Sequence, residues 1–107
     1  MSGAVKKRYA YKTANHSLTG SDHIVMFNGS VSTLTASLPN LNIDLNGIEY
    51  KVKNTGTQDV YITGAAGAKQ VIDGETHKTI TTGQSLTLLG FYSDTGYEWS
   101  ILDYYNV

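Results

Sequence analysis

The amino-acid sequence predicts an all-β fold of antiparallel strands. Apolar and charged residues alternate from Ile48 to Lys53, the pattern of a strand with one face in water. A turn at 54–57 and a second alternating segment at 59–63 follow, so this stretch is typical of an antiparallel hairpin with Gly56 at positive φ. About eight or nine such short segments, separated by turn residues, indicate a sandwich or barrel. No stretch shows convincing helical periodicity.

The first half of the chain contains two clear local signals. Tyr9 and Tyr11 lie on one side of a candidate strand at 8–13. Asn28-Gly29 is a strong hairpin signal, because both positions of a type I′ turn need positive φ. We therefore expect strands at 8–13, 23–27 and 31–38, the last with Leu34, Ala36 and Leu38 facing inward, and a loop at 15–22.

The second half continues the pattern of short strands and turns. The segment 41–47 alternates like a strand, although its Asn and Asp residues and its closing Gly47 favour a loop. Gly90 is expected to mark a bulge or bend in a strand, and Trp99 to lie at the centre of the core. Further strands are expected at 70–73, 77–81, 85–92 and 97–101, with connections at 64–68, 82–83 and 94–96.

Composition limits the classes of function. The chain has 107 residues, which suits one domain, and only 16% of them are charged, so the surface is largely neutral and polar. There is no cysteine, which excludes disulfides and thiolate metal sites. No apolar stretch is long enough to span a bilayer, and the beginning of the chain lacks the pattern of a signal peptide. We therefore expect a protein made in the cytoplasm that binds no membrane.

The charges are unevenly distributed along the chain. Four of the eight basic residues and none of the nine acidic ones fall in the first fifteen positions, which leaves four bases against nine acids, or −5, in the remainder. This asymmetry indicates a basic N-terminal arm at 1–15 and a β-sandwich domain at 16–107. Such an arm is either a solvated tail or a segment that docks on an acidic partner surface.

No constellation of residues predicts an enzyme. His16, His23 and His77 lack the spacing of metal ligands, and most Asp residues fall at predicted turns, where their side chains accept backbone N–H bonds. The chain has no phosphate loop and no nucleophile elbow. Tyr9 and Tyr11, beside basic residues, meet only loosely the requirements for stacking on nucleic acid. We expect no catalysis, no cofactor, no metal and no nucleic-acid partner.

The order of several short motifs is more specific than any one of them. The motifs are Leu38-Pro39, the stretch 47–57, Val60-Tyr61-Ile62, Ile72-Asp73-Gly74, Ser85-Leu86-Thr87-Leu88 and Tyr97-Glu98-Trp99-Ser100-Ile101. In this order they resemble the small β-domains of tailed-bacteriophage virion proteins, which occur in fibre tips, tailspikes and capsid decoration proteins. The resemblance covers roughly positions 23–102. It implies a jelly-roll-like β-sandwich that forms a homotrimer in the virion, with no catalytic residue carried over.

The resemblance implies two roles. The favoured one is a capsid decoration or cement protein that binds the major capsid protein, or another virion protein, as a trimer and stabilises the particle, because few residues precede the module. The alternative is a tail-fibre or head-fibre module that recognises a glycan on the host surface.

Three sets of residues are candidates for these contacts. Basic and aromatic residues of the arm are expected to dock on the capsid: Lys6, Lys7, Arg8, Tyr9, Tyr11 and Lys12. Residues of neutral strand faces, with the two tyrosines that follow the last strand, are expected at the trimer interface: Thr33, Thr35, Tyr61, Thr63, Tyr104 and Tyr105. Glycan contact is expected from Tyr92, Asp94 and Tyr97.

Overall fold

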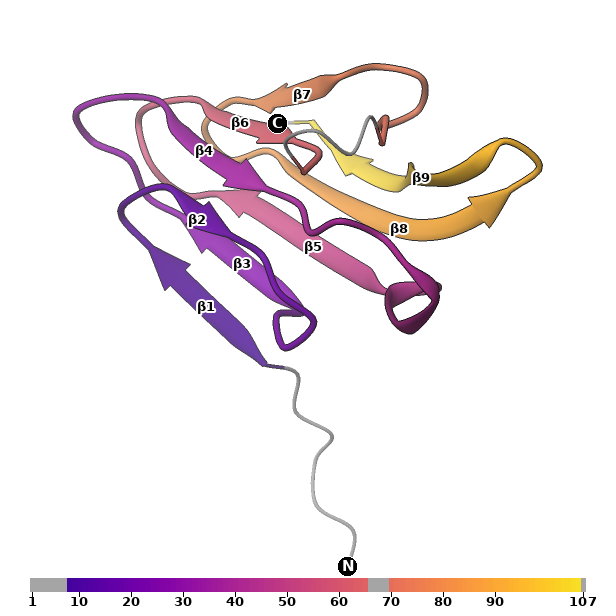
Figure 1. The fold of residues 1–107 in the computed structure, drawn as a ribbon. Coiled ribbons are helices and arrows are strands. Elements are labelled where there is room, and N and C mark those ends of the chain that lie inside the picture. The colour runs from indigo at the N-terminus through magenta and orange to yellow at the C-terminus, as the bar shows by residue number, and fades with distance from the viewer. Residues whose placement is uncertain (1–7, 66–69, 107) are drawn as a thin grey trace, which may run out of the picture.

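The computed structural model describes residues 8–65 and 70–106, which form two β-sheets and no α-helix. The five-stranded sheet has the strand order β1-β3-β5-β8-β9, the four-stranded sheet has the order β2-β4-β6-β7, and one core lies between them (Figure 1). The strands are β1 (Tyr9–Lys12), β2 (His16–Ser17), β3 (Ile24–Phe27), β4 (Leu34–Ser37), β5 (Glu49–Asn54), β6 (Val60–Thr63), β7 (His77–Ile80), β8 (Ser85–Ser93) and β9 (Gly96–Tyr105), and a 3-10 turn, η1 (Ile43–Leu45), precedes β5.

The first six strands alternate between the two sheets. β1, β3 and β5 are neighbours in the larger sheet, β2, β4 and β6 are neighbours in the smaller one, and all four pairs among them are parallel. The chain therefore winds from one sheet to the other and back, and each turn stacks on the one before it. Among the named strands of the described residues, the antiparallel pairs are β6–β7, β5–β8 and β8–β9.

The predicted hairpins at 23–38 and 48–62 are wrong. β5 and β6 belong to different sheets and contribute buried residues to the same core, and so do β3 and β4. Alternation shows which face of a strand is buried, but it does not identify the hydrogen-bonded neighbour. Two amphipathic strands can therefore meet through their apolar faces instead of their edges. The all-β prediction is confirmed, whereas the purely antiparallel arrangement is replaced by two mixed sheets.

Stacked corners take the place of the predicted turns. Neither Gly29 nor Gly56 has positive φ. The corner after β5 lies on the corner after β3, where the Thr55 N–H donates to the Phe27 carbonyl oxygen at 2.8 Å and the Thr57 N–H donates to the Gly29 carbonyl oxygen at 2.9 Å. A Cβ atom on Gly56 would lie 2.6 Å from the Gly29 carbonyl oxygen. Glycine is thus needed here because two backbones approach closely, not because φ is positive.

The side chain of Asn54 links the two sheets at this corner. Asn54 is fully buried at the end of β5, and its amide nitrogen donates to the carbonyl oxygens of Gln58 at 2.8 Å and Ile80 at 3.0 Å. Its amide oxygen accepts from the Gly56 N–H at 2.9 Å. One side chain therefore ties the end of β5 to the corner before β6 and to the end of β7, and its own polar atoms are all paired.

Most single-strand predictions are confirmed. Tyr9 and Tyr11 lie on the same side of β1, and Leu34, Ala36 and Leu38 are buried. Trp99 is fully buried, and its ring centroid lies 5.7 Å from that of Tyr50.

The connections show three further outcomes. The loop at 41–47 is confirmed, with η1 capped by the Asn42 side chain. The expected strand at 70–73 is reduced to isolated bridges at Ile72. Gly90 makes no bulge: the register shift lies between Thr87 and Leu88, and Gly90 leaves room for Leu41, whose Cδ2 would lie 2.5 Å from an added Cβ. The connection at 64–68 extends beyond the described residues.

The surroundings of Tyr50 raise the pKa of its hydroxyl group. Its ring is buried, and its hydroxyl donates to the Thr19 carbonyl oxygen at 2.6 Å. Burial, with a smaller contribution from the negative charge of Asp22, raises the pKa of Tyr50 from 10 to about 12. The folded protein therefore retains this proton at a pH where the unfolded chain releases it.

We predict that Asn54→Ala lowers the free energy of unfolding by about 3 kcal/mol, because three hydrogen bonds are lost and their backbone partners stay buried. Urea unfolding measures the change. The control Asn46→Ala alters an exposed asparagine and should change stability by less than about 0.5 kcal/mol. Equal effects of the two substitutions would contradict the buried position of Asn54.

We also predict an alkaline loss of stability that Tyr50→Phe removes. The contribution of Tyr50 is fully present below pH 10 and is lost as the pH rises towards about 12. Over this range the unfolded state binds fewer protons, so stability falls by about 1 kcal/mol per pH unit. Tyr50→Phe should be less stable than the wild type at pH 8, and the gap should narrow above pH 10 in urea unfolding. Tyr92→Phe is the control, and a gap that stays constant would refute the prediction.

Candidate functional site

β1 carries the described part of the predicted docking set. Tyr9 is 70% exposed and Tyr11 is 53% exposed, and both point away from the core. The Asn28 amide donates to the Tyr11 hydroxyl, which fixes the position of that ring. Arg8 and Lys12 flank the two tyrosines, whereas Lys6 and Lys7 lie outside the described residues. Part of the segment expected to be an arm is therefore the edge strand of a sheet.

The parallel register places two lysines on the same face as these tyrosines. Tyr9 pairs with Ile24, which pairs with Lys51. In the next row on that face, Tyr11 pairs with Met26, which pairs with Lys53. Paired residues of neighbouring strands point to the same side of a sheet. We call this array the basic aromatic face, and it consists of Tyr9, Tyr11, Ile24, Met26, Lys51 and Lys53.

The strands of the basic aromatic face concentrate positive charge. Arg8 and strands β1, β3 and β5 contain four basic residues and one acidic residue, so this region carries +3 although the whole chain carries −1. The basic residues are Arg8, Lys12, Lys51 and Lys53, and the acidic one is Glu49. These side chains are divided between the two sides of the sheet. Lys51, Lys53 and Glu49 alternate onto the face of the two tyrosines, whereas Arg8 and Lys12 occupy the opposite positions of β1. The face of the tyrosines therefore presents two lysines and one glutamate along β5.

Lys51 and Lys53 are the functional candidates that the sequence did not identify. Their alternation with Tyr50 and Val52 marked them only as solvent-facing. Their place in the same rows as Tyr9 and Tyr11, on the other side of β3, depends on the parallel pairing of β1 with β3 and of β3 with β5.

The rest of this sheet face adds a hollow and a cation–π contact. The hollow has a volume of about 350 Å³ and is lined by His23, Ile24, Glu49, Tyr50, Lys51 and Thr87. Its donors are Lys51, Thr87 and His23, and Glu49 supplies a carboxylate. In the second row, the Lys53 ammonium lies 5.7 Å from the centroid of the Tyr105 ring.

The predicted trimer-interface residues do not share one face. Thr35, Tyr61 and Thr63 lie together on the outer face of the four-stranded sheet, where Thr35 pairs with Tyr61 and the Tyr61 ring stacks on His77 with centroids 4.4 Å apart. Thr33 precedes β4 and is exposed. The two C-terminal tyrosines of the set belong to β9 in the other sheet, and both are exposed.

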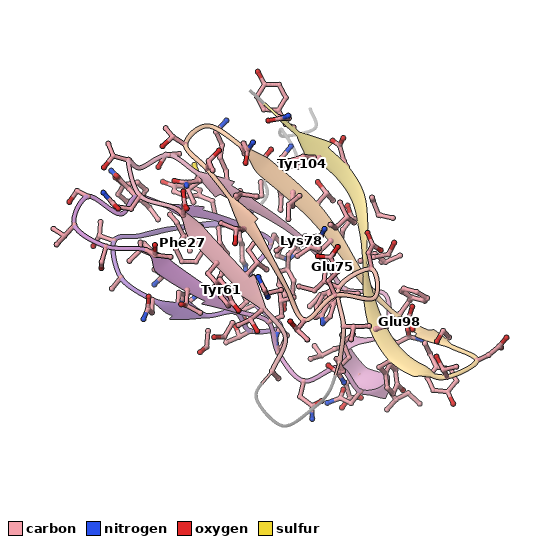
Figure 2. All side chains as sticks on the ribbon, turned by 90° about the horizontal axis from the view of Figure 1, so that it is seen from above. Phe27, Tyr61, Glu75, Lys78, Glu98 and Tyr104 are labelled. Carbon is pink, nitrogen blue, oxygen red and sulfur yellow. The ribbon has the colours of Figure 1, made fainter. Side chains whose placement is uncertain are left out.

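Tyr104 borders a second depression, between β7 and β9. This groove has a volume of about 280 Å³, and its apolar floor comes from Ile80, Leu86 and Ile101. Lys78 lies at its side and bonds to the Glu75 carboxylate at 3.0 Å; Figure 2 shows these two residues and Tyr104.

The predicted glycan-contact residues are brought together at the tip of the β8–β9 hairpin. Tyr92 pairs with Tyr97, their rings meet edge to face with centroids 4.9 Å apart, and Asp94 lies in the turn between them. Tyr92 and Asp94 are exposed, whereas Tyr97 packs partly against the core. The tip thus presents one exposed aromatic ring, with a carboxylate two positions further along the chain.

Comparison with known proteins identifies no family. The chain matches no protein-family model, and no curated protein sequence matches it. Within residues 8–65 and 70–106, no three histidine or acidic side chains gather as metal ligands would. The same residues include no helix long and apolar enough to cross a membrane.

Proposed function

We propose that this chain is a non-enzymatic structural protein of a virus particle, a decoration or cement protein that binds the particle surface as a homotrimer. The proposal rests on the resemblance in motif order to bacteriophage virion domains and on one structural observation. That observation is the register that aligns Tyr9 and Tyr11 with Lys51 and Lys53 on one broad sheet face. A flat array of exposed aromatic and basic side chains suits a protein surface better than a small molecule.

In this proposal the two sheets form a β-sandwich, and three copies associate through the outer face of the four-stranded sheet. Thr35, Tyr61 and Thr63 give that face hydroxyl groups and no fixed charge. Burying such a face against its own copies costs little in charge desolvation. Trimer formation leaves the basic aromatic face free to contact the particle.

The bound trimer stabilises the particle by bridging neighbouring subunits of its shell. A ligand that binds only the assembled shell shifts the equilibrium toward that shell. Each copy adds contact area that must be separated before the shell can open. The basic arm contributes positive charge next to β1, where Arg8 and Lys12 flank the exposed tyrosines.

We predict that a chain lacking residues 2–7 remains a trimer but loses most of its co-sedimentation with virus particles deprived of this protein. The deletion keeps β1 in place, which a longer deletion through position 12 would remove. It eliminates the positive charges of Lys6 and Lys7, and exposed charge pairs contribute roughly 0.2–1 kcal/mol each. Light scattering measures the mass, and sedimentation measures binding.

The matched control is Lys78→Gln, which removes a positive charge on β7, in the other sheet. It should co-sediment like the wild type. Undiminished co-sedimentation of the shortened chain would refute the docking role of the arm. A wild-type mass equal to one chain would refute the trimer.

The β8–β9 tip supports a second candidate function, recognition of a host-surface glycan. An exposed aromatic ring next to a carboxylate is suited to stacking on a sugar ring and accepting bonds from its hydroxyl groups. Tyr92 and Asp94 provide these two groups, and the Tyr97 ring supports Tyr92 from the edge.

We predict that Tyr92→Ala weakens binding to any glycan bound by the wild type by roughly tenfold, since the stacking surface is removed. A glycan array followed by titration calorimetry measures this effect. Tyr9→Ala, which removes another exposed tyrosine, on β1, is the control and should bind glycans like the wild type. An array without hits, or equal losses in both variants, would exclude this function for the tip.

A further inference from the structure

The basic aromatic face repeats at the period of an extended chain. Tyr9 and Tyr11 on β1, and Lys51 and Lys53 on β5, are each two residues apart, a spacing of roughly 6.8 Å along a strand. The two columns flank β3, so they lie roughly 10 Å apart. Ile24 and Met26 form the apolar column between them. An extended segment lying over β3 has the same repeat in its own side chains.

The chemistry of the columns specifies the side chains of such a segment. A glutamate at every second position of such a segment would place its methylene groups on Ile24 and Met26 and its carboxylate within reach of Lys51 and Lys53. The hollow beside Lys51 also offers the Thr87 hydroxyl and the His23 ring as donors. The tyrosine column bounds the other side of the segment and covers it with aromatic surface.

We propose that the basic aromatic face binds an extended acidic segment of a partner protein, with carboxylates at alternate positions paired to Lys51 and Lys53. This inference rests on the proposed function and names the partner chemistry of its docking surface. Salt weakens the interaction, because the ion pairs lie at the protein surface.

The acidic neighbours of this face favour a protein over a nucleic acid. Glu49 precedes Lys51 on β5, and Asp103 lies in the row of Lys51 through Thr87. Both carboxylates repel a continuous chain of phosphates. A polypeptide, in contrast, carries carboxylates only at alternate positions, and its backbone N–H groups and hydroxyl side chains can donate hydrogen bonds to Glu49 and Asp103. Positive and negative side chains thus lie next to one another on this face, which suits a protein segment with spaced charges better than a nucleic acid with one charge per phosphate.

The test is the binding of a fluorescent peptide, about ten residues long, in which glutamate alternates with threonine, to the full-length protein at low salt. We expect binding that weakens at least about tenfold when every glutamate is replaced by glutamine, and by a similar factor in the protein variant Lys51→Glu/Lys53→Glu. The variant Lys51→Arg/Lys53→Arg should retain binding. The control Lys78→Glu reverses a charge on β7 and should bind like the wild type.

Several results would overturn the inference: no binding of the acidic peptide, equal binding of its glutamine form, or tighter binding of an oligothymidylate of similar length. Light scattering and circular dichroism show whether each variant remains folded and assembled. Should Lys51→Glu/Lys53→Glu misfold, Lys51→Gln/Lys53→Gln serves in its place. The protein could fail to bind the acidic peptide and still co-sediment with virus particles. That result would refute this inference and leave the proposed function intact.

Discussion

The buried side chain of Asn54 is the interaction on which the arrangement of the two sheets depends. Its amide group binds three backbone groups from Gly56, Gln58 and Ile80. Its own backbone N–H donates to the Gln84 carbonyl oxygen and its carbonyl oxygen accepts from the Gly83 N–H, in the turn just before β8. The side-chain amide and the backbone groups of Asn54 therefore join the ends of strands β5 to β8 at one corner. Few other residues can satisfy so many backbone groups without water, because an amide both donates and accepts.

The stacked turns explain how distant residues form one surface. In a hairpin, the neighbours of β5 would be its sequence neighbours. In the wound chain, β5 instead lies beside β3 and two strands from β1. Lys51 and Lys53, in the middle of the sequence, therefore lie on the same sheet face as Tyr9 and Tyr11, near its beginning. The functional proposals follow from this register more than from any individual motif.

Local sequence patterns predicted the strands and their buried faces but not their partners. Alternation in 34–38 and 48–53 identified inward residues, because burial depends on the side chain itself. Partner choice depends on how complete rows of side chains pack across the core, and turn signals such as Asn28-Gly29 did not reveal it. Gly56 illustrates the difficulty, since the same glycine suits a left-handed turn and a tight contact between backbones. The hairpin tip at Tyr92 and Tyr97 was predictable because its pairing is local, whereas the place of Lys51 and Lys53 depended on distant strands.

The winding of β1 to β6 also has a consequence for synthesis on the ribosome. Partners in β3 and β5 are 27 positions apart, as between Ile24 and Lys51, and the antiparallel neighbour of β5 is β8, where Leu88 pairs with Tyr50. Contacts between residues so far apart in the sequence form slowly, because the intervening chain must be ordered before the strands gain hydrogen bonds. A nascent chain that has emerged only as far as β6 lacks the strand that completes the larger sheet. The larger sheet can therefore be completed only after β8 and β9 have both emerged from the ribosome.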